Sequence, residues 1–121
     1  MPKFAENIAP FVLEQIETAR LAAADNDQER AFRHLENAHV LGQESTYWHV
    51  KVHWLMLLWA FRNRDTTEAF GQLIRILGAS LLTAIKGVPI GNTGGSNVSP
   101  VKPMRLTEEH AAVIAKAKNS R

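Results

Sequence analysis

Residues 34–56 read HLENAHVLGQESTYWHVKVHWLM, and this stretch decides how the chain folds. It is divided at Gly42, and glycine commonly ends a helix. We therefore expect one helix to end near Leu41. The next helix should begin near Ser45 or Thr46, because both side chains suit the N-cap position. Two helices joined by so short a turn lie antiparallel, so side chains on either side of the turn should face each other.

Apolar residues recur at helical spacing on both sides of this turn. The expected helices cover about residues 8–24, 28–41, 46–62 and 66–86. The first helix should start after Asn7 and place Pro10 in its opening turn, where a missing N–H costs nothing. Asp65 and Glu68 have the spacing of a capping box for the fourth helix. The sequence therefore predicts an all-α fold.

An internal repeat accompanies these helices. The residues Asp27, Ala31, Phe32 and Leu35 recur 38 positions later as Asp65, Ala69, Phe70 and Leu73. Small and large residues at this spacing are typical of tetratricopeptide-like hairpins. We expect two such hairpins, over about residues 8–42 and 45–86, to form a four-helix arrangement within residues 1–86. The segment that begins at residue 87 is too rich in Gly and Pro for a helix, and a short last helix over about 107–118 should fold back on the same domain.

Composition excludes several classes of protein. The chain has no cysteine, so disulfides, thiolate nucleophiles and iron–sulfur clusters are excluded. The net charge is +2, and most of the excess lies after residue 101, so we expect no nucleic-acid partner. The apolar runs are too short for a membrane span, and the N-terminus does not read as a signal peptide. We therefore expect a cytoplasmic protein.

The histidines form the candidate site. His49 and His53 are one turn apart on the third expected helix, on the face opposite its polar side. Unpaired buried polar groups cost on the order of 1–3 kcal/mol, so both imidazoles need partners. Across the turn, Glu36 and His39 have the Glu-x-x-His spacing of carboxylate-bridged metal bundles. His34 lies about 140° around its helix from His39, so we set it aside.

These residues predict a metal site made of Glu36, His39, His49 and His53. Its donors suit zinc, or iron or manganese if a coordination position stays open. Met56 follows His53 at a spacing that keeps copper as a less favoured choice. Two alternatives need no metal: the histidines could hydrogen-bond to Gln43, Gln72 or backbone carbonyls, or one of them could act as a general base. Whether the protein is an enzyme is left open by the residues.

Several motifs together resemble a family. The quoted segments are His34-Leu-Glu-x-Ala-His39-Val-Leu-Gly-Gln43, His49-x-x-x-His53 with Met56-Leu57, Gly71-Gln72-x-x-Arg75, and Gly87-Val-Pro-x-Gly-Asn-Thr-Gly-Gly95. In combination they resemble the bacterial domain of unknown function DUF3703, over roughly residues 8–104. The resemblance implies a small helical protein and supplies no activity. We also expect Gln72 and Arg75, which are polar residues on an apolar helix, to anchor the glycine-rich segment.

The leading functional hypothesis is therefore a small cytoplasmic protein that binds a metal ion, in metal handling or metal-dependent chemistry. The alternative is a tetratricopeptide-like module that binds a protein partner or a second copy of itself. The two hypotheses differ in what they require of the structure. Metal binding needs converging imidazoles, whereas an interaction module needs an exposed apolar groove.

Overall fold

The computed structural model describes residues 2–84, 94–95 and 103–119. In these residues the chain forms five helices and no strand, so the all-α prediction is confirmed. The helices are α1 (Pro2–Ala24), α2 (Gln28–Gly42), α3 (Thr46–Arg62), α4 (Thr66–Ala84) and α5 (Glu108–Asn119). Most of the expected Gly/Pro-rich segment, residues 87–93 and 96–100, lies outside the described residues. None of the described helices is long and apolar enough to cross a membrane.

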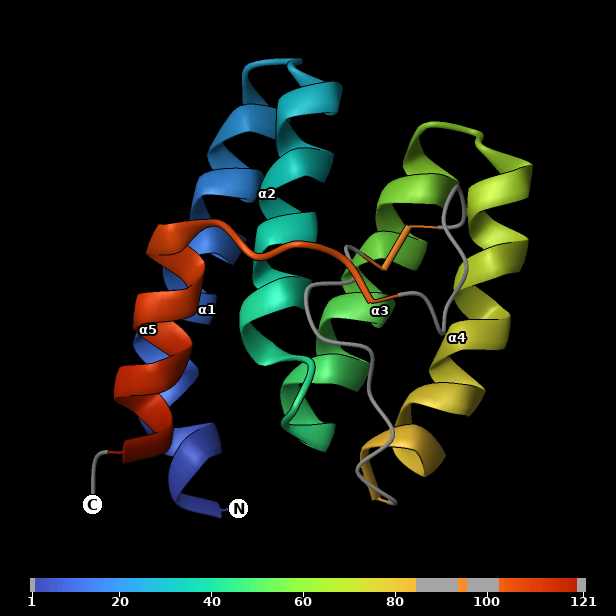
Figure 1. Ribbon diagram of the computed structural model, residues 1–121. Coiled ribbons are helices and arrows are strands. Elements are labelled where there is room, and N and C mark those ends of the chain that lie inside the picture. The colour runs from blue at the N-terminus through green and yellow to red at the C-terminus, as the bar shows by residue number, and fades with distance from the viewer. Residues whose placement is uncertain (1, 85–93, 96–102, 120–121) are drawn as a thin grey trace.

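The helices lie side by side in the order α5, α1, α2, α3, α4 (Figure 1). We call α1 with α2 hairpin 1 and α3 with α4 hairpin 2, because each pair is antiparallel and joined by a short turn. The last helix, α5, packs on α1, where Asn7 Nδ2 donates to the Ala117 carbonyl over 3.0 Å. The predicted last helix is thus confirmed, and it covers the outer side of hairpin 1.

The first helix begins earlier than we predicted. It starts at Pro2 instead of after Asn7, and Pro10 lies inside it. The extra turns, residues 2–7, place Phe4 in the core beside Ile8, and these two side chains are 5% and 0% exposed. Burying such a side chain stabilises a fold by about 1.5–3 kcal/mol. Burial of Phe4 beside Ile8 is thus comparable to the cost of about 3 kcal/mol for a proline within a helix.

The close approach of α2 to α3 explains Gly42. We expected this glycine to stop the second helix, but α2 includes it and the following Gln43 is still helical, with φ −65°. A Cβ atom on Gly42 would lie 2.7 Å from Trp48 Cβ, so a larger residue would push the two helices apart. Ser45 then caps α3 as predicted, accepting from the Trp48 N–H over 3.4 Å. The turn therefore sets how tightly hairpin 2 packs on hairpin 1.

The turns within the two hairpins have the same hydrogen bonds. The Asp27 N–H donates to the Ala22 carbonyl over 2.9 Å, and 38 positions later the Asp65 N–H donates to the Ala60 carbonyl over the same distance. The residue before each aspartate has a positive φ, 61° at Asn26 and 55° at position 64. This is the Schellman arrangement that ends a helix.

Both aspartates then cap the helix that follows. Asp27 Oδ1 accepts from the Arg30 N–H over 3.2 Å, and Asp65 Oδ1 accepts from the Glu68 N–H over 2.9 Å. The expected capping box needs correction in its second half, because the Glu68 carboxylate accepts from Gln72 Nε2 over 2.5 Å. The sequence repeat is thus matched by repeated turns, and Glu68 is turned toward the interior.

Candidate metal centre

Three histidines converge between α2 and α3. Their ligand atoms all lie within 4.8 Å of one another, and His39, His49 and His53 are 2%, 4% and 2% exposed. The ring centroids are 4.6 Å apart for His39 and His53, 4.9 Å for His39 and His49, and 5.0 Å for the two histidines of α3. The predicted meeting of imidazoles across the turn at Gly42 is observed.

The hydrogen bonds of His53 fix the orientation of its ring. Its Nε2 lies 3.0 Å from His39 Nε2, and its Nδ1 lies 2.5 Å from Gln72 Oε1. Gln72 Nε2 donates to Glu68 Oε2 and to the Gly94 carbonyl, so the amide oxygen of Gln72 must accept. His53 therefore carries its proton on Nδ1, which leaves the Nε2 lone pair directed at His39.

Burial keeps His49 and His53 neutral. It lowers the pKa of His49 to about 4. Burial also lowers the pKa of His53 to about 3, and the neighbouring His49 and Arg75 lower it further, while the hydrogen bond that His53 donates to Gln72 raises it. Both imidazoles are thus unprotonated at neutral pH, the form in which a histidine ligates a metal.

The glycine-rich segment touches the site through Gly94. This residue is buried, and its φ of +84° favours glycine. A Cβ atom there would lie 2.5 Å from Cδ2 and 2.8 Å from Nε2 of His39, so only a hydrogen leaves room for the ring. Gln72 anchors the segment at Gly94, as predicted, and Arg75 donates to the Gly71 carbonyl of its own helix over 3.2 Å. The predicted loop residues 91–93 lie outside the described residues.

Two other predicted assignments concern Glu36 and His34. Glu36 is half-buried and does not belong to the group of ligand atoms within 4.8 Å, so its role as a fourth ligand stays a prediction. Burial raises its pKa, and the nearby Glu68 raises it further. His34 lies elsewhere, with its Nδ1 2.8 Å from Gln15 Oε1 on α1, which agrees with setting it aside.

The expected hydrogen bond between a site histidine and Gln72 is observed at His53, whereas the sequence did not point to Glu68 as the partner of Gln72. A signal for the bond between His53 and Gln72 was present in the repeat, because Gln15 and His34 are 38 positions before His53 and Gln72. Each hairpin thus joins its two helices by a histidine–glutamine bond, with the residue types exchanged. The repeat thus distinguishes Gln72 from the other expected partners of the histidines and pairs it with His53.

A family model described as "Protein of unknown function (DUF3703)" matches residues 6–114. The chain belongs to the DUF3703 family. No curated protein and no solved structure matches the chain.

The match confirms the resemblance expected from the sequence motifs. In this DUF3703 chain it spans from α1 into α5 and includes the three histidines, Gln72 and Gly94. The family description states no activity.

Proposed function

We propose that this DUF3703 protein binds a divalent transition metal ion, zinc first, through His39, His49 and His53. One observation carries the proposal: three buried imidazoles converge with their ligand atoms within 4.8 Å of one another. The amide oxygen of Gln72 accepts from Nδ1 of His53, and metal-bound histidines commonly have such a partner on the nitrogen that does not bind the metal.

The spacing of the nitrogens is compatible with one ion. Two nitrogens bound to a tetrahedral zinc at 2.0–2.1 Å lie about 3.3 Å apart. The Nε2 atoms of His39 and His53 are 3.0 Å apart, so an ion would replace the N–H···N bond between them after a small rotation of the rings. His49 lies on the same face of α3, one turn before His53, and completes a set of three.

Charge and donor type favour the same ion. Two of the ligands are held neutral by burial, so no proton need be displaced from them at neutral pH. The carboxylate of Glu68, bound to Gln72, supplies negative charge behind His53. We propose Glu36 as the fourth ligand. If water takes that place instead, three imidazoles and an open position suit metal-dependent chemistry as well as metal handling, and iron or manganese as well as zinc.

Elemental analysis of protein purified without a histidine tag tests this function. We expect about one equivalent of metal per chain after exposure to zinc and gel filtration, and loss of it in His49→Ala and His53→Ala. His34→Ala is the matched control, because it removes a half-buried histidine of hairpin 1 and should keep the metal. Metal-free wild-type protein, or variants that retain the full equivalent, would refute the proposal.

We infer as a second function that the two hairpins are tetratricopeptide-like repeats that bind a protein. The supporting observations are the repeated turns at Asp27 and Asp65 and the repeated histidine–glutamine bond. Such repeats bury their faces by stacking, and an unstacked face is available to a partner. This function does not depend on the metal.

A further inference from the structure

The outer face of hairpin 2 is apolar and exposed. Tyr47, Trp54 and Phe61 follow one another at intervals of seven residues, so they form a single stripe along α3. All three are more than half exposed, and so are Phe70 and Ile74 of α4. Isolated exposed apolar residues are ordinary, whereas a continuous group marks an interaction surface.

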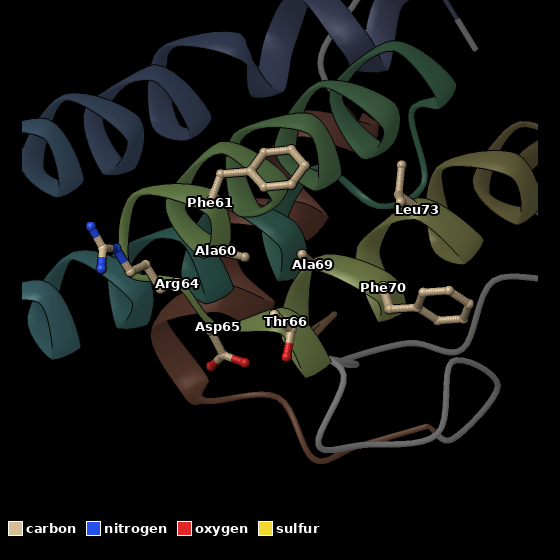
Figure 2. Close-up of a pocket in the computed structure, with 8 residues that line it drawn as sticks. All are labelled: Ala60, Phe61, Arg64, Asp65, Thr66, Ala69, Phe70 and Leu73. Atoms are coloured by element: carbon tan, nitrogen blue, oxygen red, sulfur yellow. The ribbon is translucent and has the colours of Figure 1, made fainter.

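A groove runs between the two helices of this face. It has a volume of about 270 Å³, and Figure 2 shows its floor at Ala60 and Ala69 between larger side chains. The full lining is Ala60, Phe61, Arg64, Asp65, Thr66, Ala69, Phe70 and Leu73. Ala60 and Ala69 have the smallest side chains of this lining. They leave space between α3 and α4 near the turn, and this space is the groove.

The internal repeat shows what covers such a groove. Phe70 and Leu73 of hairpin 2 correspond to Phe32 and Leu35 of hairpin 1. Leu35 is 5% exposed, whereas Leu73 is 49% exposed. The difference arises because α3 packs on α2 and no described helix packs in the same way on α4.

One tryptophan of α3 makes the key contacts with hairpin 1. The Trp59 ring lies 4.5 Å from the Phe32 ring, measured between centroids. Its Nε1 donates to the Gln28 carbonyl over 3.0 Å, at the start of α2. The corresponding groups on hairpin 2 are the exposed Phe70 ring and the carbonyl of Thr66, which lines the groove.

Charge around the groove constrains the partner. Lys51 and Arg62 are exposed and lie eleven residues apart on α3, which places them on one stripe beside the aromatic residues. Arg64 lines the groove itself, while the Asp65 carboxylate caps α4. Two copies joined face to face would bring these cations together, whereas an acidic helix would neutralise them.

We propose that the groove between α3 and α4 binds an amphipathic helix of another protein, with a tryptophan seated on Phe70 as Trp59 is seated on Phe32. The polar face of this helix carries acidic residues. The inference rests on the repeat-like stacking proposed above and is independent of the metal. The helix takes the place of the first helix of a third repeat.

A synthetic helical peptide of 17 residues tests the proposal on the intact protein. It keeps the residues Trp48, Val52, Leu55 and Trp59 at their spacing in α3. Glutamate and alanine occupy the other positions, and the peptide carries a fluorescein label.

We expect saturable binding of this peptide in fluorescence anisotropy with a dissociation constant on the order of 10 μM, as for a small transient interface. Phe70→Ala should weaken it at least tenfold (on the order of a hot-spot loss). Leu21→Ala, which removes an exposed leucine of α1 outside the groove, should leave it unchanged.

The docking proposal rests on repeat-like stacking of hairpin 2 on hairpin 1. The melting temperatures of two variants test the stacking and the docking separately. We expect Phe32→Ala to lower the melting temperature by at least about 5 °C and Phe70→Ala by less than about 2 °C. No effect of Phe32→Ala would overturn the stacking. A normal effect of Phe32→Ala together with no peptide binding, or with binding that Phe70→Ala leaves intact, would overturn the docking proposal alone. A wild-type dimer in sedimentation that Phe70→Asp dissociates would assign the face to self-association and also overturn it.

Discussion

The two hairpins share a backbone plan and differ in what their side chains do. Both end their first helix on an alanine carbonyl and cap the second with an aspartate, at Asp27 and at Asp65. Both join their helices by a histidine–glutamine bond. Hairpin 1 is covered by α5 on one side and by α3 on the other, whereas none of the described helices covers the outer face of hairpin 2.

The exchange of histidine and glutamine explains why the site lies where it does. In hairpin 1 the histidine is His34 on the second helix, half-buried, and its pKa is lowered by burial and then by Arg30 and Arg33. In hairpin 2 it is His53 on the first helix, which faces His39 across the turn between the hairpins. The bond between His34 and Gln15 thus joins two helices only, α1 and α2. The corresponding bond between His53 and Gln72 belongs to a cluster that joins three helices, α2, α3 and α4.

The largest expected effect is stabilisation by metal, which should depend on both hairpins. Zinc at about 1,000 times its dissociation constant should raise the free energy of unfolding by about 4 kcal/mol. The rise should vanish in His39→Ala, because His39 is the histidine ligand that hairpin 1 supplies, and persist in His34→Ala. Chemical denaturation with and without zinc measures it. Stabilisation that survives His39→Ala would show that the ion does not join the hairpins.

Acid should affect the histidines of hairpin 2 next most strongly, in metal-free protein. Folding lowers the pKa of His49 to about 4 and that of His53 to about 3, from 6.5. The unfolded chain therefore binds more protons between pH 6.5 and 4, and stability falls as the pH falls through this window. At about 1.4 kcal/mol per pKa unit, each of the two histidines should contribute a loss of about 3 kcal/mol. Denaturant titrations in EDTA should show a smaller fall in His49→Gln/His53→Gln than in the wild type, and equal falls would contradict the account.

The contact between Gly94 and His39 predicts a contrast between two glycines. Gly94→Ala places a Cβ 2.5 Å from the ring at a positive φ, so it should destabilise by about 2–3 kcal/mol and weaken zinc binding. Gly78→Ala is the control, because nothing lies within 4 Å of its Cβ position in α4, and it should stabilise by about 0.5–1 kcal/mol. Equal thermal unfolding of the two variants would argue against the contact.

The two glutamines should differ in their effect on metal affinity. Gln72→Ala removes the acceptor that orients His53, and loss of such a partner weakens metal binding about 10–100-fold. Gln15→Ala removes the corresponding bond to His34 and should leave metal affinity unchanged. Competition with a chromophoric zinc chelator measures both constants. An unchanged constant for Gln72→Ala would mean that His53 needs no orienting partner.

The smallest expected effect is the loss of an N-cap, and it tests whether the turns of the two hairpins are equivalent. Asp27→Ala and Asp65→Ala each remove an N-cap, which costs about 1 kcal/mol. Because the two turns have the same hydrogen bonds, the losses should agree to within about 0.5 kcal/mol (the usual scatter between independent sites). Urea unfolding gives both values. A loss at one site and none at the other would break the equivalence of the turns.

Local signals were sufficient to predict most of the fold. Helical periodicity predicted the helices, and the N-cap residues Ser45 and Asp65 predicted where two of them begin. The position of His49 and His53 on one face of the third helix predicted the site. The start of α1 was missed because burial of Phe4 and Ile8 outweighs the preference of Pro10 for a first turn.

Contacts distant in sequence could not be predicted in the same way. The fit of Gly94 on His39 joins residues 55 positions apart, and no local pattern encodes it. The same holds for the direction of the Glu68 carboxylate, which the spacing assigned to a capping box and which packing turns toward Gln72. Such choices follow from tertiary packing, which outweighs local preference.

Long-range proton–nitrogen NMR of the imidazole rings, before and after one equivalent of zinc, tests the central claim most directly. The ring nitrogens of His39, His49 and His53 should shift together at a ratio of one ion per chain, with the His53 proton on Nδ1. Those of His34 and His110 should stay in place. Unchanged spectra of the three buried rings, or shifts at His34 instead, would contradict the proposal that this cluster is a metal site.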